Sequence, residues 1–262
     1  MSTTNGSGVD GRRARVGVVI PSTNTSVEAD YNDLRPDDVS FHVARIFINT
    51  SIDSDDKAQE TLRQIREGNE KAVHDVCTCE PDHLIMGMSS ETFVGGLEGS
   101  RELTKRMEEL SGLNVSTGSE ATNLALESIG AKRIAVLTPY QPSIDAQVER
   151  YFDDLGYEMV AMKSLRCPTA TSIAEVTDEE ILDAIAELEG MAEGEFDAFV
   201  QAGTNLSSWG VADEVERRTG KPLISINAAT VWHALGILGI DQRLPGAGSV
   251  FAGAADAGSR DA

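Results

Sequence analysis

Short, nearly continuous apolar runs alternate along the chain with longer amphipathic stretches. The runs have the composition of strands that are buried on both faces of a sheet, and they lie at 15–20, 82–87, 133–138, 197–202 and 222–226. Apolar residues recur at helical spacing between them, at 56–76, 100–112, 119–131, 178–192 and 211–220. This alternation predicts an α/β fold with parallel sheets and right-handed crossovers.

The second half of the chain repeats the pattern of the first. A basic residue, a strand, a proline, a polar loop and an acidic helix occur twice, with Pro21 and Pro139 lying 118 residues apart. A strand followed by a hydroxyl-rich loop also occurs twice, with Met88 and Gly203 lying 115 residues apart. These similar spacings predict two similar Rossmann-like lobes related by a pseudo-twofold axis, with the site in the cleft where strand ends converge.

The predicted boundaries place residues 14–117 and 226–251 in the first lobe and residues 118–225 in the second. The ends of the chain, 1–13 and 252–262, are rich in small and polar residues and are expected to be disordered. The first residues have no apolar centre of the kind found in secretory signals, and no apolar run approaches the roughly 20 residues of a membrane helix. We therefore expect a cytoplasmic protein that does not enter a membrane.

Acidic residues dominate the charge balance. The chain has 22 Lys and Arg against 43 Asp and Glu, for a formal net charge of −21, which argues against nucleic acid or an anionic membrane as a partner. Acidic side chains occur on nearly every polar face, a distribution that favours a protein adapted to a salty cytoplasm. An ordinary acidic protein is the alternative.

The residues that usually hold cofactors show no suitable spacing. The odd number of cysteines, two of them as C-x-C, indicates neither a disulfide framework nor a C-x-x-C metal or redox motif: Cys77, Cys79 and Cys167. The four histidines also lack ligand spacing: His42, His74, His83 and His233. Neither glycine-rich phosphate motif follows a predicted strand. The sequence therefore predicts no metal and no nucleotide cofactor.

Polar loops follow the strands of the first half. In PSTNTSVE (21–28), Thr23 and Asn24 precede a helix, where free N–H groups would suit a carboxylate; plain helix capping is the alternative. In MGMSSETFVGG (86–96), Ser89 and Ser90 could stabilise an oxyanion or an enediolate. Glu91, the only carboxylate in the paired loops, is a candidate to move a proton, although an acid at a helix start is also structurally favoured.

The loops of the second half are similar. In TPYQPS (138–143), the Tyr140 hydroxyl could donate to a substrate carboxylate or pack between the lobes. In QAGTNL (201–206), Gly203 is followed by Thr204 and Asn205, in the position that matches the Ser89 loop. The two halves therefore offer polar groups at four strand ends.

Several stretches together resemble the maleate cis-trans isomerase and arylmalonate decarboxylase family, within the aspartate/glutamate racemase superfamily. They span about residues 14 to 250 and are VGVVIPSTNTSVE, MSSETFVGG, VLTPY, GTNL, EVERRTGKPLISINAATVW and LPGAG. The resemblance implies two α/β lobes and a cofactor-free, metal-free site for small mono- or dicarboxylates. It also implies that Asn24 and Tyr140 bind a substrate carboxylate. Oxyanion cradles are then expected at Ser89, Ser90, Thr204 and Asn205.

The chain departs from this family pattern at the reactive centre. The superfamily carries cysteines at one or both strand ends, and here Met88 and Gly203 stand in those places. A thioether does not titrate and glycine has no side chain, so racemisation or isomerisation through these cysteines is not available. Glu91, or a water in the space left at Gly203, is the expected replacement.

Two interpretations of function remain open. The first is a cofactor-independent isomerase, lyase or decarboxylase that acts through an enediolate-like intermediate. In it, Asn24, Tyr140 and loop amides bind a carboxylate, while Ser89, Ser90 and Thr204 stabilise the enediolate and Glu91 moves the proton. The second is a non-catalytic protein that binds small carboxylates. A homo-oligomer is suggested by the habits of the family.

Overall fold

The computed structural model describes residues 13–253. The predicted disorder of residues 1–13 and 252–262 lies almost entirely outside this range. Only Arg13 and residues 252–253 of those two segments are described, and Ala252 ends helix α11 (Ser249–Ala252).

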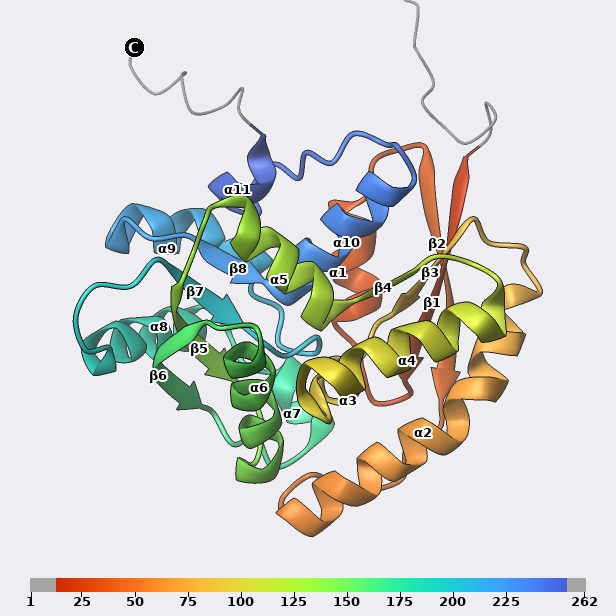
Figure 1. Cartoon of the computed structure of the whole chain (residues 1–262), viewed down its shortest axis with the longest axis horizontal. Helices are drawn as coiled ribbons and strands as arrows, with labels where there is room; N and C mark the ends of the chain where they lie inside the picture. Colours follow the sequence, from red (N-terminus) through yellow and green to blue (C-terminus); the bar gives the residue numbers. More distant parts are fainter. Residues whose placement is uncertain (1–12, 254–262) are drawn as a thin grey trace, which may run out of the picture.

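Two four-stranded parallel sheets form the framework of the molecule (Figure 1). The first has the strand order β2-β1-β3-β4 and the second has the order β6-β5-β7-β8, so the two halves share one topology. The strands are β1 (Ala14–Pro21), β2 (Val39–Ile46), β3 (His83–Met86), β4 (Val115–Thr117), β5 (Arg133–Thr138), β6 (Glu158–Ser164), β7 (Ala198–Gln201) and β8 (Leu223–Ser225). Every pairing is parallel. The predicted α/β fold with two similar lobes is confirmed.

Helices connect successive strands and cover the sheets. The longer ones are α1 (Val27–Leu34), α2 (Asp55–Cys77), α4 (Gly96–Ser111), α5 (Gly118–Ser128), α6 (Pro142–Asp154), α8 (Asp178–Met191), α9 (Ala212–Thr219) and α10 (Ile226–Ile237). Short helices α3 (Ser90–Phe93) and α7 (Ala170–Ala174) and a 3₁₀ turn (Trp209–Val211) lie in loops. In the described part of the chain, none of these helices has both the length and the apolar character needed to cross a membrane.

The sequence patterns located β1, β3, β5, β7 and β8 but not β2, β4 and β6. β2 and β6 are edge strands whose residues are mostly half-buried, so they lack a continuous apolar run. β4 has three residues, too few to show a periodicity. β8 is equally short and also lies at an edge, but Leu223 and Ile224 form an apolar run, whereas β4 has Val115 as its one apolar residue.

Helices α5 and α10 pack against each other at the junction of the lobes. They begin where β4 and β8 end, at the predicted boundaries 117/118 and 225/226. One apolar core cluster includes Val16 and Ile85 from the first sheet together with Val136 and Val200 from the second. This shared core fixes the four inner strands β1, β3, β5 and β7 relative to one another.

Helix α2 forms one side of the cleft because of its sequence. Ser54 caps it by accepting the N–H of Lys57. Ala58, Leu62 and Ile65 follow at spacings of four and three residues, so they share one buried face. The first half of this face turns toward the strand ends and becomes part of the cavity wall.

Candidate active site

A cavity lies where the carboxyl ends of β1, β3, β5 and β7 meet, and it encloses about 670 Å³ when its open mouth is included. Nine of the ten residues predicted for the site line it: Thr23, Asn24, Met88, Ser89, Ser90, Tyr140, Gly203, Thr204 and Asn205. The tenth, Glu91, does not. The parallel topology thus brings together loops that are up to 180 residues apart in the sequence, as the contact between Asn24 and Thr204 illustrates.

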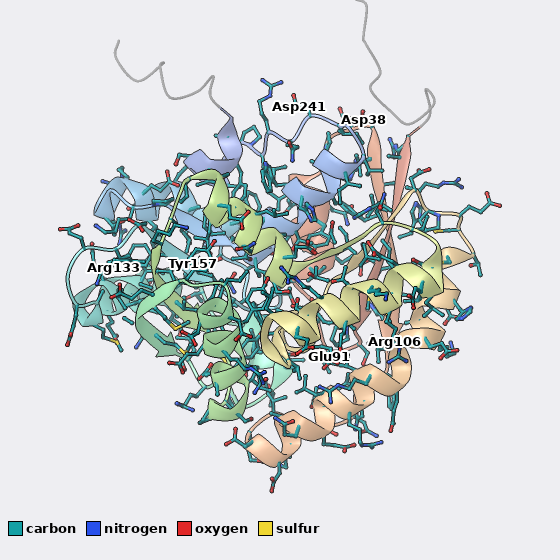
Figure 2. The ribbon with its side chains drawn as sticks, viewed as in Figure 1. Asp38, Glu91, Arg106, Arg133, Tyr157 and Asp241 are labelled. Atoms are coloured by element: carbon teal, nitrogen blue, oxygen red, sulfur yellow. The ribbon has the colours of Figure 1, made fainter. Side chains whose placement is uncertain are left out.

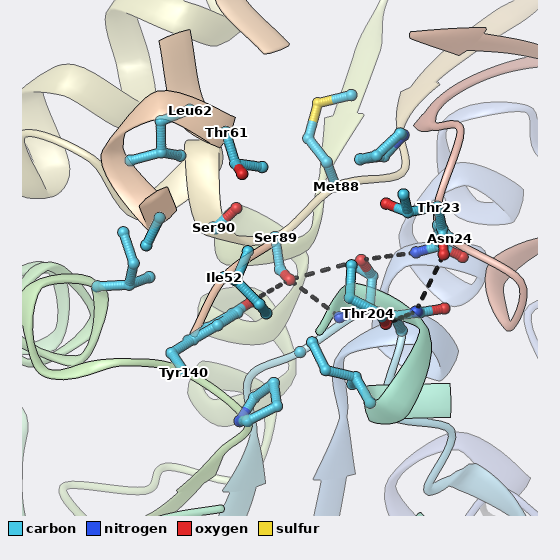
Figure 3. Close-up of a pocket in the computed structure, with 18 of the residues that line it drawn as sticks. Thr23, Asn24, Ile52, Thr61, Leu62, Met88, Ser89, Ser90, Tyr140 and Thr204 are labelled. Atoms are coloured by element: carbon cyan, nitrogen blue, oxygen red, sulfur yellow. Dashed lines mark hydrogen bonds between the residues drawn. The ribbon is translucent and has the colours of Figure 1, made fainter. Parts of the chain in front are cut away.

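A chain of hydrogen-bonded hydroxyl groups crosses the cavity from one lobe to the other (Figure 3). The Tyr140 hydroxyl and the Ser89 hydroxyl are in direct hydrogen-bond contact. Ser89 Oγ accepts the backbone N–H of Thr204 at 2.9 Å and lies 3.5 Å from Thr204 Oγ1. Asn24 Nδ2 in turn donates to Thr204 Oγ1 at 3.4 Å. Protons can therefore be redistributed along this chain without any movement of the backbone.

The surroundings of Tyr140 keep its hydroxyl protonated. Burial raises the pKa of Tyr140 above its usual range, and the contact with Ser89 only partly opposes this effect. Ser89 is also buried, with 4% of its surface exposed. The Thr204 N–H points at Ser89 Oγ and would stabilise negative charge there if the hydroxyl gave up its proton. Ser89 is therefore a hydroxyl with a preorganised backbone donor.

The position of Asn24 determines which end of its amide faces the cavity. Its Oδ1 accepts the backbone N–H groups of Ser26 and Val27, at 3.2 and 3.0 Å, and so caps α1. The Nδ2 group is left on the cavity side, where it contacts Thr204. One end of the Asn24 amide therefore caps the helix, and the other lies on the cavity side, so helix capping does not exclude the predicted contact with a carboxylate.

Asn205 contacts the first lobe through its Oδ1 and its backbone carbonyl and the second lobe through its Nδ2. Its Oδ1 accepts the N–H groups of Thr25 and Ser26, at 2.8 and 3.1 Å. Its Nδ2 donates to the carbonyl of Ala170 at 2.6 Å, and its own carbonyl accepts the Ser26 hydroxyl. The second Nδ2 hydrogen has only a long contact of 3.5 Å with the Thr23 carbonyl, so the predicted contact between Asn205 and substrate would compete with that contact.

The N-terminus of α1 is closed by these two asparagines. The N–H groups of residues 25 to 27 all have side-chain acceptors within the protein, from Asn24 or Asn205. The expected free N–H groups for a carboxylate at this helix start are therefore absent among residues 25–27. What this loop offers to the cavity is side-chain donors.

Glu91 points away from the cavity toward α2. Its Oε1 accepts the Arg66 Nε at 2.7 Å, while Oε2 is buried without a hydrogen-bond partner among the described residues. Burial raises the pKa of Glu91, and the hydrogen bond from Arg66 opposes this rise. Figure 2 shows Glu91 close to α4, which carries Arg106. The expectation that Glu91 moves a proton to substrate conflicts with this position, because neighbouring residues in a helical turn point in different directions.

The space at Gly203 is filled by the ring of Pro139. A Cβ atom at position 203 would lie 2.7 Å from both Cδ and Cγ of that ring, closer than side chains normally approach. A water therefore has no room in the direction that a side chain at position 203 would take, although Gly203 does line the cavity. On the other side, Met88 is 1% exposed, and its side chain extends away from the hydrogen-bonded hydroxyls (Figure 3).

The sequence patterns did not predict how apolar the rest of the cavity is. Its remaining wall consists largely of aliphatic side chains from α2, α6, α7 and the loop before α2: Ile52, Ala58, Leu62, Ile65, Ile144 and Ile173. The helical spacing of Ala58, Leu62 and Ile65 was visible in the sequence, but it indicates only that this face is buried. That it faces a cavity depends on the second lobe.

The cavity contains no formal charge. Among the described residues that line it, Tyr140 is the only one with a titratable side chain. The three cysteines lie elsewhere, with Cys167 buried and the other two half-buried. Nor does any group of three or more His, Cys, Asp or Glu side chains within residues 13–253 converge as a metal site would require. A carboxylate in this cavity would be bound by neutral donors.

Known proteins are similar to this chain in both sequence and architecture. The family model for arylmalonate decarboxylase matches residues 16–251. A maleate isomerase of Pseudomonas putida is 27% identical over 254 residues, covering 92% of this chain and 98% of that protein. An arylmalonate decarboxylase of Bordetella bronchiseptica is 26% identical over 168 residues, covering 64% of this chain and 69% of that protein.

A solved structure gives the same architecture. The maleate cis-trans isomerase of Nocardia farcinica superposes with a TM-score of 0.80 at 22% identity, covering 91% of this chain and 98% of that one. That crystal contains a cysteine-to-serine mutant with a covalently bound succinylcysteine intermediate. The named relatives are isomerases and a decarboxylase, which supports an enzyme of one of these types. Since the family model covers nearly all of the described chain, this protein belongs to the arylmalonate decarboxylase family.

Proposed function

We propose that this protein is a cofactor-independent decarboxylase or isomerase for a small carboxylate that bears an apolar substituent, and that its hydroxyl chain replaces a reactive cysteine. The observation that carries this proposal is the placement of Tyr140, Ser89 and Thr204 in hydrogen-bond contact beside an uncharged, largely aliphatic wall. Donors on one side suit a carboxylate or an enediolate, and the wall suits an apolar group.

The charge distribution favours decarboxylation of a substituted malonate. One carboxylate accepts hydrogen bonds from Asn24 Nδ2 and the hydroxyls. The second is left against aliphatic side chains such as Leu62 and Ile173, where an ionised carboxylate is poorly solvated. Breaking its bond to the α-carbon releases neutral CO₂, and the bonding electrons pass into the remaining carboxylate as an enediolate. The wall thus destabilises the substrate more than the departing product.

The hydroxyl chain then supplies the proton. Ser89 donates a proton to the α-carbon of the enediolate and the Thr204 N–H stabilises the oxygen left behind, or Tyr140 donates the proton and Ser89 contacts the oxygen left behind. Water returns the proton after product release. The raised pKa of Tyr140 keeps the group in the form that can donate. Ser90 and Thr23, which also line the cavity, would bind the remaining carboxylate oxygens.

The experiment measures product formation from phenylmalonate and from maleate by proton NMR in D₂O. We expect phenylacetate with deuterium at the α-carbon, and little fumarate, because isomerisation of maleate would leave both carboxylates in place, one of them still against the aliphatic wall. Tyr140→Phe and Ser89→Ala should each lower kcat by about 10²- to 10⁴-fold, which is the usual contribution of a general acid.

A matched control removes a tyrosine hydroxyl elsewhere. Tyr157 lies in the second lobe and donates to Asn123 Oδ1 at 2.9 Å, away from the cavity. Tyr157→Phe should therefore leave kcat unchanged. If Glu91→Gln abolished turnover while Tyr140→Phe retained it, the proton would belong to Glu91 and the hydroxyl mechanism would be wrong.

One observation favours a second function, the binding of a small carboxylate without reaction. Apart from Tyr140, the described lining has no side chain that titrates. A binding protein would show a higher melting temperature with phenylmalonate or succinate but no product and no exchange of α-protons. Thermal stabilisation and NMR on the same samples distinguish the two functions.

A further inference from the structure

Two buried side-chain amides hold the peptide groups on either side of Thr204. Gln201 Nε2 donates to the carbonyl of Gly203 at 2.7 Å, and this carbonyl also accepts the N–H of Leu206 at 2.8 Å. Asn227 Nδ2 donates to the carbonyl of Thr204 at 2.9 Å. Gln201 and Asn227 are both fully buried, so no water competes for these contacts.

Each amide is itself fixed by a second contact. Ser208 Oγ donates to Gln201 Oε1 at 3.0 Å, which determines which end of the Gln201 amide faces Gly203. Asn227 Nδ2 also donates to Asp30 Oδ2 at 2.6 Å, and Asp30 is 4% exposed. The orientation of both amides therefore follows from their surroundings, and Asp30 and Asn227 connect α1 and α10 to the loop after β7.

The planarity of the peptide group makes these contacts important for the cavity. The carbonyl of Gly203 and the N–H of Thr204 belong to one peptide group, so a donor that holds the carbonyl also sets the direction of the N–H. That N–H is the one that points at Ser89 Oγ, at 2.9 Å. The second amide holds the next peptide group and so fixes both sides of the Thr204 Cα atom.

We infer that Gln201 and Asn227 are positioning residues, which aim the Thr204 N–H and hydroxyl at Ser89. The expected effect on turnover rests on the proposed function, but the effect on the direction of the Thr204 N–H does not. A loop left without these donors could rotate its peptide groups and would stabilise charge on Ser89 less well. Neither residue lines the cavity, so both act through Thr204.

Isosteric variants test this inference. Gln201→Glu keeps an oxygen for Ser208 to donate to but places a second oxygen against the Gly203 carbonyl, and Asn227→Asp does the same at Thr204. A protonated carboxyl group can still donate, so the donor is present at low pH and lost once the introduced acid ionises. Gln201→Glu therefore switches a single contact with pH, whereas Asn227→Asp changes the contact with Asp30 as well.

The primary measurement is hydrogen exchange of the Thr204 amide in the full chain, followed by NMR from pH 6 to 9. Its rate is divided by that of Val200 in strand β7, which corrects for the pH dependence of exchange and for global unfolding. The ratio should rise by about 10-fold or more as the introduced acid ionises in either variant, and should stay constant in the wild-type protein. A ratio that stays constant in both variants would overturn the inference.

Three further variants complete the test. Asn69→Asp introduces an acid at an equally buried amide on α2, 2% exposed, and should leave the ratio unchanged. If a buried acid prevents folding, Gln201→Met and Asn227→Ala remove the same donors without charge and should raise the ratio at every pH. A ratio that remained at the wild-type value in these variants would also overturn the inference.

Turnover of phenylmalonate provides a second, separate measurement. In Gln201→Glu and Asn227→Asp, kcat should fall over the same pH range in which the exchange ratio rises, while KM stays within about 3-fold because Asn24, Thr23 and Ser90 still donate to the substrate carboxylate. If the wild-type protein does not turn over phenylmalonate, the proposed function fails for this substrate. The exchange of the Thr204 amide still decides whether Gln201 and Asn227 position the loop.

Discussion

Protonation of a buried histidine should make this protein less stable in mild acid. His83 begins β3 and is fully buried. Its Nε2 lies 2.8 Å from Ser116 Oγ, which in turn lies 3.1 Å from His233 Nδ1 on α10. Burial lowers the pKa of His83 to about 4, with a smaller contribution from His233. The His83 imidazole therefore takes up a proton near pH 6.5 in the unfolded chain, but stays neutral at that pH in the folded chain.

The magnitude follows from linkage between protonation and folding. The stabilisation from an uncharged His83 is fully present above pH 6.5 and is lost as the pH falls toward 4. Each pKa unit corresponds to about 1.4 kcal/mol, so the interval from 6.5 to about 4 amounts to roughly 3 kcal/mol. Burial also lowers the pKa of His233, which adds to the effect in the same direction.

Urea unfolding of the wild-type protein and of His83→Gln, monitored by circular dichroism at pH 4 to 7.5, measures this contribution. The stability advantage of the wild type over the variant should shrink by roughly 3 kcal/mol across that range. Other groups titrate in both proteins and cancel in the difference. His74→Gln, at an exposed position of α2, gives the background effect of the substitution. Parallel curves for the wild type and His83→Gln would refute the argument.

Two further predictions concern the packing at Gly203 and the net charge. Gly203→Ala should lower the free energy of unfolding by about 1–3 kcal/mol, because the added Cβ atom would lie 2.7 Å from the Pro139 ring. The control Gly210→Ala places its Cβ atom in open space and should lower the free energy of unfolding much less in the same urea experiment. The melting temperature should rise between low and molar KCl because salt screens the repulsion within a chain of net charge −21, and an unchanged melting temperature would contradict the predicted salt adaptation.

The inner strands could be predicted because nearly all of their consecutive residues are apolar. β1, β5 and β7 are buried on both faces, so nearly every position is apolar, and the pattern needs no knowledge of neighbours. The order of elements then restricts the topology to parallel crossovers. The carboxyl ends of such strands lie at one edge of the sheet. The loops that follow them could therefore be assigned to one site from the sequence alone; they contain Asn24, Ser89, Tyr140 and Thr204.

The roles of individual polar residues could not be predicted in this way. Asn205 and Glu91 have suitable chemistry and lie in the right loops. Asn205, however, is engaged by backbone groups of both lobes, and Glu91 faces Arg66 on α2. These partners lie 25 to 180 residues away in the sequence. Local spacing contains no information about which direction such a side chain takes.

The sequence by itself therefore determined the class of fold, the repeat and the four loops, because periodicity and turn residues are local properties of the chain. Only the tertiary structure decided that the Pro139 ring fills the space beside Gly203, that aliphatic side chains form much of the cavity wall, and that buried amides hold Thr204. The physical reason is that packing and hydrogen-bond pairing depend on distances between segments from both lobes. Those distances exist only after the two sheets have come together around their shared core.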